Sequence, residues 1–186
     1  MSICCQWSEG YSIYIDYHDN EWGKPEFDSQ KLFENLCLEG QQAGLSWITV
    51  LKKQEKYRQA FFGFNPKEIA QMQAVDIDKL MANSGLIRYR KKLEAIVKNA
   101  QAYLAMEERG EDFSQFIWSF VDGKPQVNNV PNYSIIPTKT ATSVALSKAL
   151  KKRGFVFVGE TTCYAFMQSM GLVNDHINDC FCKINL

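Results

Sequence analysis

The amino-acid sequence predicts an all-α fold, and three features carry that prediction. Apolar residues recur at the spacing of a helix turn along most of the chain. Residues that favour helix N-termini stand directly before several of these segments, and glycine follows some of them. No run of residues alternates convincingly between apolar and polar side chains, as a half-buried β-strand would.

The first predicted helices each start at a residue that can cap a helix N-terminus. Asp28 precedes apolar residues that share one helical face, namely Leu32, Phe33, Leu36 and Cys37. Ser46 can cap a second helix, which should end near residues 61–63. Asn65 stands before Pro66 and three residues before Glu68, an order typical of a helix start. The polar, aromatic segment over residues 6–23 is expected to be irregular.

Helices continue to the end of the chain, with one long interruption. The remaining predicted helices cover residues 76–83, 89–107, 113–120, 141–153 and 161–170, with a last turn or two from Asn174. Residues 124–138 contain three prolines and several asparagines. We expect this region to be a loop that crosses between two helical lobes of one domain, residues 1–186.

Length and composition fit one globular domain. The chain has 186 residues, of which 46% are hydrophobic and 23% charged, close to the average for a soluble protein. Lys plus Arg equal Asp plus Glu at 21 each, so any nucleic-acid-binding surface must be local. No apolar run approaches the ~20 residues that span a bilayer, and no export signal is recognisable. We therefore expect a cytoplasmic protein without a membrane partner, with a monomer as the default.

The cysteines and histidines predict a metal site. In a reducing compartment the six cysteines are expected to be thiols or metal ligands rather than disulfides. His176 and Cys180 are four residues apart, so both would point to one side of a helical turn. A closed, tetrahedral zinc site would be completed by two residues near the N-terminus, giving the set Cys5, His18, His176 and Cys180. Cys4 and Cys182 remain rival ligands, and ordinary hydrogen-bonded histidines with unliganded thiols remain the alternative.

A single carboxylate, Glu39, stands in the run CLEGQQAGLSW among small and aromatic residues. Five aromatic residues bracket it in the sequence, namely Trp7, Tyr14, Tyr17, Trp22 and Trp47. Taken singly, each aromatic residue is best explained as part of the core, and the glutamate as a solvated side chain. Together they predict a pocket for a flat, cationic ligand, held by stacking and cation–π attraction on its faces and by the carboxylate at its edge.

The run KALKKRGFVFVGETTCYAF predicts a helical hairpin over residues 154–159. The second helix would present backbone N–H groups at its N-terminus beside Lys151, Lys152 and Arg153, an arrangement that suits a phosphate. An ordinary hairpin between two packed helices explains the same spacing.

Four runs of this sequence resemble the type I 3-methyladenine DNA glycosylase family: YHDNEWG, LEGQQAGLSWITVLKK, LSKALKKRGF and GLVNDH. The similarity extends from Cys5 to Cys180. It implies a helix-hairpin-helix DNA glycosylase fold with a structural zinc ion that joins the two chain ends. It also implies hydrolysis of the N-glycosidic bond of 3-methyladenine in double-stranded alkylated DNA, which releases the free base and leaves an abasic site without lyase activity.

The same resemblance implies roles for individual residues. Glu39 falls on the family's base-recognising, catalytic glutamate, Tyr17 on a tyrosine that hydrogen-bonds the base, and Trp47 on a stacking tryptophan. Other pocket positions are Trp7, Tyr14 and Trp22. The zinc ligands fall on Cys5, His18, His176 and Cys180. The DNA-backbone element is the hairpin with Lys151, Lys152 and Gly159.

One position departs from the wider superfamily. Many helix-hairpin-helix glycosylases carry an aspartate two residues before a histidine here, and this sequence has Asn174. Asp175 is one residue closer to His176 and is expected to point elsewhere. The type I family resembles this sequence in lacking that aspartate. A non-catalytic, zinc-stapled nucleic-acid-binding module that recognises a flipped or modified base is the alternative, and base release separates the two.

Overall fold

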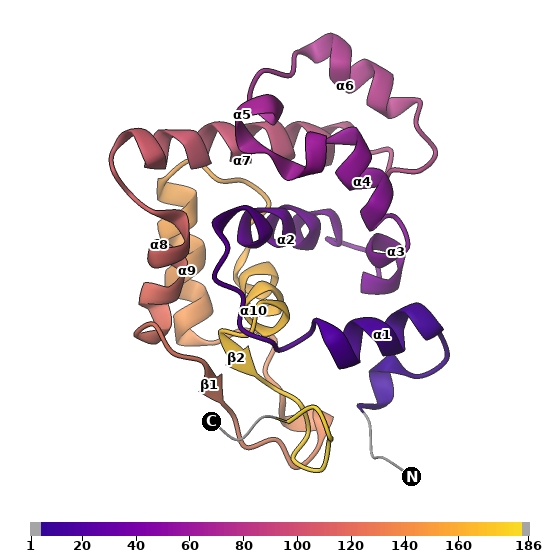
Figure 1. Ribbon diagram of the computed structural model, residues 1–186, viewed down its shortest axis with the longest axis vertical. Coiled ribbons are helices and arrows are strands. Elements are labelled where there is room, and N and C mark those ends of the chain that lie inside the picture. Colours follow the sequence, from indigo (N-terminus) through magenta and orange to yellow (C-terminus); the bar gives the residue numbers. More distant parts are fainter. Residues whose placement is uncertain (1–4, 184–186) are drawn as a thin grey trace.

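Helices dominate the computed structural model, which describes residues 5–183 (Figure 1). In chain order the α-helices are α1 (Ser12–Asn20), α2 (Ser29–Gln41), α3 (Trp47–Leu51), α4 (Gln54–Ala60), α5 (Pro66–Ile69), α6 (Ala74–Met81), α7 (Arg90–Glu108), α8 (Phe113–Trp118), α9 (Ala141–Lys152) and α10 (Glu160–Ser169). Short 3₁₀ helices are η1 (Gln6–Ser8), η2 (Phe62–Phe64), η3 (Ser119–Val121) and η4 (Tyr133–Ile135). The prediction of an all-α class is confirmed.

The centre of the molecule is the packing of α2 against α10 (Figure 1). α9 packs on α10, and α7 covers the other side of α2. α5 and α6 in turn pack on α7. The buried face of α2 includes the predicted residues Leu32, Phe33 and Leu36, each fully buried. None of the described helices is both long and apolar enough to span a membrane.

Local sequence fixes where α2 begins and what its last turn carries. The predicted cap is confirmed, because Asp28 Oδ1 accepts a hydrogen bond from the Lys31 backbone N–H at 2.9 Å. The buried side of the last turn includes Glu39. The helix therefore delivers its carboxylate to the interface with α10.

The end of α10 is fixed by a backbone contact that only glycine allows. Gly171 has φ +71°, and a Cβ built there would lie 2.3 Å from the carbonyl carbon of Lys24. Two further backbone bonds join this corner, from Gly23 N–H to the Gln168 carbonyl and from the Glu26 N–H to the Met170 carbonyl, each 3.1 Å. The segment after Trp22 thus runs directly along the end of α10.

Several local expectations were wrong. Part of the segment expected to be irregular forms α1, which starts without a side-chain cap. The helix predicted from Ser46 is two helices, α3 and α4, broken between Leu51 and Gln54. The start of α10 is close to its prediction, because the helix begins at Glu160, directly after its N-cap residue Gly159.

The C-terminal segment also differs from its prediction. In place of a helical turn from Asn174, strand β2 (Val173–Asn174) pairs in parallel with β1 (Gln126–Val127), and turns follow. β1 lies inside the region predicted as a loop, which is otherwise irregular apart from η4. That residues 124–138 connect two lobes of one domain stays a prediction.

Candidate functional site

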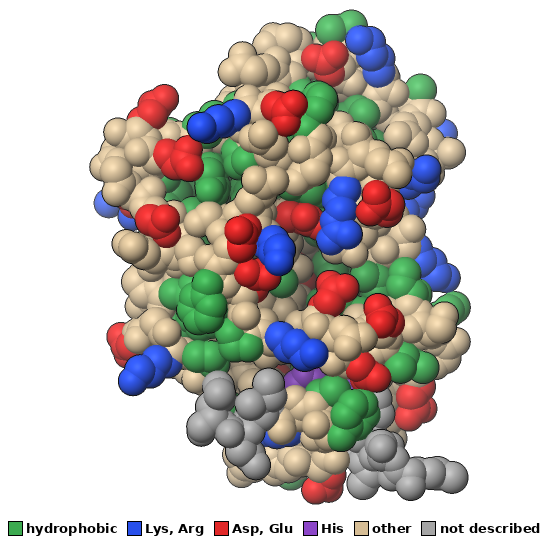
Figure 2. Space-filling view, viewed as in Figure 1, with side chains coloured by type: hydrophobic (Ala, Val, Ile, Leu, Met, Phe, Trp, Pro, Cys, Tyr) green, Lys and Arg blue, Asp and Glu red, His purple; other side chains and the backbone are tan. Residues whose placement is uncertain are grey.

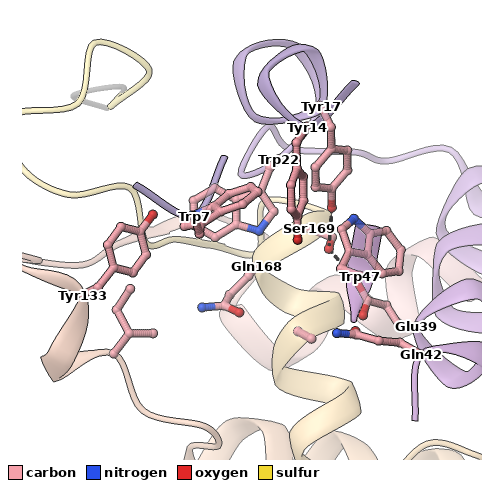
Figure 3. Close-up of a pocket in the computed structure, with 12 residues that line it drawn as sticks. Trp7, Tyr14, Tyr17, Trp22, Glu39, Gln42, Trp47, Tyr133, Gln168 and Ser169 are labelled. Atoms are coloured by element: carbon pink, nitrogen blue, oxygen red, sulfur yellow. Dashed lines mark hydrogen bonds between the residues drawn. The ribbon is translucent and has the colours of Figure 1, made fainter. Parts of the chain in front are cut away.

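An aromatic pocket of about 270 Å³ opens between α1, α2, α3 and α10 (Figure 3). The six residues predicted for it all line it, namely Trp7, Tyr14, Tyr17, Trp22, Glu39 and Trp47. Six more line it that the sequence reasoning missed, namely Gln42, Tyr133, Ile136, Ala165, Gln168 and Ser169. Ala165, Gln168 and Ser169 share one face of α10 through their i, i+3 and i+4 spacing, and the polar pair inside the apolar run CYAFMQSMG was the available signal.

The aromatic rings of the pocket support one another. Trp7 packs edge to face against Tyr14 and Trp22, with ring centroids 5.1 and 5.0 Å apart. Tyr17 and Trp47 lie 5.7 Å apart in a tilted pair. Because each ring contacts another, the apolar walls are held in place without a ligand.

Glu39 is the buried carboxyl group of this pocket, with 3% of its surface exposed. Its Oε1 accepts a hydrogen bond from Ser169 Oγ at 2.6 Å, and that oxygen accepts one from the Tyr17 hydroxyl at 3.0 Å. Glu39 Oε2 has no hydrogen-bond partner among the described residues, and neither does the buried indole N–H of Trp47. One carboxyl oxygen is therefore committed to the protein and the other is left for a ligand.

Burial controls the charge of Glu39. Desolvation raises the pKa of Glu39 to about 8, although the Ser169 hydrogen bond lowers it in part. Burial and the nearby Glu39 also raise the pKa of Tyr14 and of Tyr17, so both phenols keep their protons. A ligand that brings positive charge or N–H donors to Glu39 would restore the ionised form, which is the chemistry that this pocket suits.

The two residues before His176 in the sequence, Asn174 and Asp175, do not line the aromatic pocket. The Asn174 side chain accepts a hydrogen bond from the His176 backbone N–H at 3.2 Å. Asp175 is turned toward Tyr164 and Gln168, so the expectation that it points elsewhere is confirmed. Neither side chain lines the cavity that contains Glu39.

A second cluster brings together the four predicted metal ligands, Cys5, His18, His176 and Cys180. All are buried, and their ligand atoms lie within 4.8 Å of one another. Cys180 Sγ lies 3.6 Å from His18 Nε2 and 3.5 Å from His176 Nδ1, and Cys5 Sγ lies 3.6 Å from His176 Nδ1. Zinc–sulfur and zinc–nitrogen bonds at the tetrahedral angle would place sulfur and nitrogen about 3.6 Å apart.

Two further observations fit a bound cation. A thiol has one proton and can donate it to one nitrogen only. Cys180 Sγ, however, lies near an imidazole nitrogen of each of the two histidines, as a thiolate bound to a shared cation would. The outer ring nitrogens have partners: His18 Nδ1 lies 2.7 Å from Asp19 Oδ1, and His176 Nε2 lies 3.0 Å from the Trp22 carbonyl. Such partners orient metal-bound imidazoles. The cluster can therefore hold a metal ion.

The local structure between His176 and Cys180 differs from the predicted helical turn. His176 and Cys180 meet through a turn, closed by the Cys180 N–H on the Ile177 carbonyl at 2.9 Å, and not through a helix. Of the rival ligands, Cys182 Sγ lies 3.9 Å from His18 Nδ1, on the side away from the cluster. Cys4 lies outside the described residues.

The predicted hairpin joins α9 to α10 and is tightly held. Asn99 binds both backbone groups of Val156, donating to its carbonyl at 3.2 Å and accepting from its N–H at 2.8 Å. Arg153 pairs with Glu111 at 2.7 Å, whereas Lys151 and Lys152 are exposed. Lys139 and Lys148 are also exposed, and with Lys151 they lie near Glu160, the first residue of α10.

As a whole, the chain offers little long-range attraction for a polyanion, because its formal net charge is zero. On the face shown in Figure 2, Lys and Arg side chains are interspersed with Asp and Glu. This mixing agrees with the formal net charge of zero. Attraction to a polyanion must therefore come from short-range contacts.

Comparisons with known proteins identify relatives that match nearly the whole chain. The family described as methyladenine glycosylase matches residues 7–183. The DNA-3-methyladenine glycosylase of Haemophilus influenzae is 74% identical over 183 residues, which are 98% of this chain and 99% of that protein.

Solved structures extend the comparison to the fold. A crystal structure of 3-methyladenine DNA glycosylase I has a TM-score of 0.97 at 60% identity, covering 98% of this chain and 100% of that one. A variant of a 3-methyladenine DNA glycosylase I, crystallised in complex with 3-methyladenine, has a TM-score of 0.94 at 44% identity and covers 100% of this chain and 99% of its own. From its sequence and its fold alike, this chain belongs to the methyladenine glycosylase family.

Proposed function

We propose that this chain is a base-excision repair glycosylase that removes 3-methyladenine from double-stranded alkylated DNA. It hydrolyses the N-glycosidic bond, releases the free base and leaves an abasic site, without lyase activity. The observation that carries the proposal is Glu39, buried in an aromatic pocket with one oxygen unpartnered among the described residues. The relatives that share almost the whole chain carry the same activity in their names.

The chemistry needs little acid catalysis. Methylation at N3 gives the adenine a formal positive charge, so the base is already a good leaving group. The protein must flip the nucleotide out of the base stack, which costs a few kcal/mol, and hold the base while the N-glycosidic bond breaks. In this proposal Trp47 stacks on the base, and the free oxygen of Glu39 accepts its N–H groups and stabilises the positive charge of the transition state. Water attacks the sugar carbon as it becomes cationic.

Other residues of the pocket support these contacts. Tyr17 donates to Ser169, which donates to Glu39, so this chain of hydrogen bonds fixes the carboxyl group in one orientation. Trp7, Tyr14 and Trp22 form the surrounding apolar wall. The exposed lysines and the N-terminus of α10 after Gly159 would bind the DNA backbone as a helix-hairpin-helix element.

We assign zinc to the cysteine–histidine cluster, because two thiolates and two imidazoles are a donor set typical of this ion. When bound, zinc supplies only a structural link, since four protein ligands leave no coordination position for substrate. Cys5 and His18 would thereby be tied to His176 and Cys180. We further propose a single cytoplasmic domain with two lobes joined through residues 124–138, active as a monomer.

Base release tests the proposed activity directly. The chain is incubated with a methylated duplex and with the same duplex unmethylated, and the released bases are identified by chromatography. We expect free 3-methyladenine from the first duplex and no free base from the second. Binding of the methylated duplex without release would instead identify a nucleic-acid-binding module.

Removal of two hairpin charges should weaken DNA binding without touching the pocket. Lys151→Ala with Lys152→Ala should reduce affinity for damaged and undamaged duplexes alike, because phosphate contacts carry no base information. Since each lysine that neutralises a phosphate displaces about one counterion, the plot of log affinity against log salt should become shallower by about 2. The measurement is a fluorescence titration at several salt concentrations.

Exposed lysines outside the hairpin, one on α5 and one on α7, provide the control. Lys67 on α5 and Lys91 on α7 are exposed, and their double alanine variant should bind duplexes as the native chain does. Affinity for free 3-methyladenine should be the same in all three chains. If the hairpin variant loses free-base affinity as strongly as duplex affinity, these lysines support the fold or the pocket.

Trp47→Ala should remove most of the stacking energy. Stacking of a base on an aromatic side chain contributes about 1–3 kcal/mol, so affinity for free 3-methyladenine should fall by that amount in a calorimetric titration. Trp47→Phe keeps a flat ring and should retain a large part of the affinity. Equal affinities for all three chains would show that the base does not stack on this residue.

A further inference from the structure

Gln168 presents a hydrogen-bond acceptor to the aromatic pocket from the side opposite the α2 carboxylate (Figure 3). Its Nε2 donates to Asp175 Oδ2 at 2.9 Å. A carboxylate only accepts hydrogen bonds, so the amide nitrogen must face Asp175 and the amide oxygen must face the other way. Figure 3 shows that oxygen turned toward the Glu39 side of the cavity.

Asp175 is held so that it cannot turn away from this contact. It is 2% exposed and accepts two further hydrogen bonds, from the Tyr164 hydroxyl at 2.5 Å and from Asn128 Nδ2 at 2.7 Å. These donors come from α10 and from the segment after β1. The orientation of the Gln168 amide is thus set by a buried network behind the pocket wall, and not by a ligand.

Glu39 and Gln168, on opposite sides of the pocket, therefore both offer hydrogen-bond acceptors to a flat base. Glu39 contributes its free carboxyl oxygen and Gln168 its amide oxygen. Adenine has an amine at C6 and so presents two N–H donors at that position. Guanine has a carbonyl oxygen at C6, which can only accept. In the same orientation a guanine would place its carbonyl oxygen against the Gln168 oxygen, so the Gln168 acceptor would lose its hydrogen bonds to water without gaining a partner.

We propose that Gln168, oriented by Asp175, is a specificity-determining residue that favours methylated purines with an amine at C6 over those with a carbonyl at C6. The inference rests on the proposed function and adds to it the selection of 3-methyladenine over 3-methylguanine. Gln168 contacts the base, and Asp175 acts as a positioning residue.

The test compares release rates of the two bases from one methylated duplex. Gln168→Met keeps the length of the side chain and removes the strong acceptor, so the ratio of 3-methyladenine to 3-methylguanine release should fall by about tenfold. Asp175→Asn allows the new amide to donate to the Gln168 oxygen, which turns the Gln168 N–H₂ group toward the cavity. In that variant 3-methylguanine release should rise while 3-methyladenine release falls.

Tyr164→Phe is the matched control, because Asn128 still donates to Asp175 and the contact from Gln168 to Asp175 stays in place. Its release ratio should equal that of the native chain. Metal content and melting temperature are measured for Asp175→Asn, which lies next to His176. If that variant does not fold, Gln168→Met still decides the question.

Two results would overturn the inference: an unchanged release ratio in Gln168→Met, or an equal loss for both bases. Titration of the native chain and Gln168→Met with the two free bases separates this failure from failure of the proposed function. A chain that releases no base, but whose preference for free 3-methyladenine depends on Gln168, would contradict the glycosylase activity and retain the specificity role.

Discussion

Glu39→Gln is expected to release 3-methyladenine about 10²-fold more slowly than the native chain while remaining folded. Ser169 donates to one oxygen of Glu39, so the amide oxygen of the variant must face Ser169. The amide nitrogen then takes the place of the free oxygen and turns two N–H donors toward the donors of the base. Single-turnover release measured by chromatography gives the rate, and equal rates would remove Glu39 from the mechanism.

The same variant should change the pH dependence of activity. Burial raises the pKa of Glu39 to about 8, so the free protein is protonated there at lower pH. Because the cationic lesion needs the carboxylate, kcat/KM of the native chain should rise with pH up to about 8 and then level off. The nearby phenols of Tyr14 and Tyr17 have raised pKa values and stay neutral through this range. In Glu39→Gln the rise attributable to this group should be absent.

Stability should respond to pH in the opposite direction. The folded chain holds the Glu39 proton more tightly than the unfolded chain, whose carboxyl has its ordinary pKa of 4.5. The stabilisation of the folded state by this tighter proton binding is complete below about pH 4.5 and is lost as the pH rises through about 8. Urea titrations at about pH 5 and about pH 8 measure this effect. Between these two pH values the unfolding free energy of the native chain should fall by several kcal/mol more than that of Glu39→Gln. A constant difference between the two chains would contradict the raised pKa.

Loss of the proposed zinc ion should act first on folding. Cys180→Ser removes the ligand that faces both histidines, and binding free energy at a structural zinc site is also folding free energy. We expect the variant to purify without zinc and to lose about 4 kcal/mol or more of unfolding free energy. Elemental analysis and denaturant titration measure both quantities, and proteolysis should cut near the chain ends first.

Cys182→Ser is the control for this experiment, since that thiol lies on the outer side of His18. It should keep one zinc per chain and the native melting temperature. Any activity left in the folded fraction of Cys180→Ser should keep its preference for the methylated base. If turnover vanished while the melting temperature stayed the same, the metal would be catalytic and the structural assignment would fail.

The sequence predicted those parts of the molecule whose cause is local or chemically distinctive. Asp28 caps α2 as predicted, because the bond spans three residues. The cysteine–histidine cluster could be predicted because the chain has two histidines, each with cysteines near it in sequence. The aromatic residues and Glu39 are of types that stand out in their surroundings.

What the sequence did not predict depends on contacts between distant segments. Ser169 meets Glu39 across 130 positions, and nothing near either residue indicates that contact. Strands β1 and β2 are two residues each, too short for a pattern to develop. α1 has no capping side chain and leaves Ile13 and Ile15 exposed, so its apolar residues do not mark a buried face.

The glycine at the end of α10 has a consequence for ligand affinity. At Gly171 two backbones touch without a side chain between them, and two backbone hydrogen bonds hold the segment after Trp22 against the helix end that carries Ser169. Conformational entropy of these walls is lost when the chain folds, and little remains to be lost when a ligand arrives. A ligand as small as a single purine can then convert most of its contact energy into affinity, even though it offers few atoms.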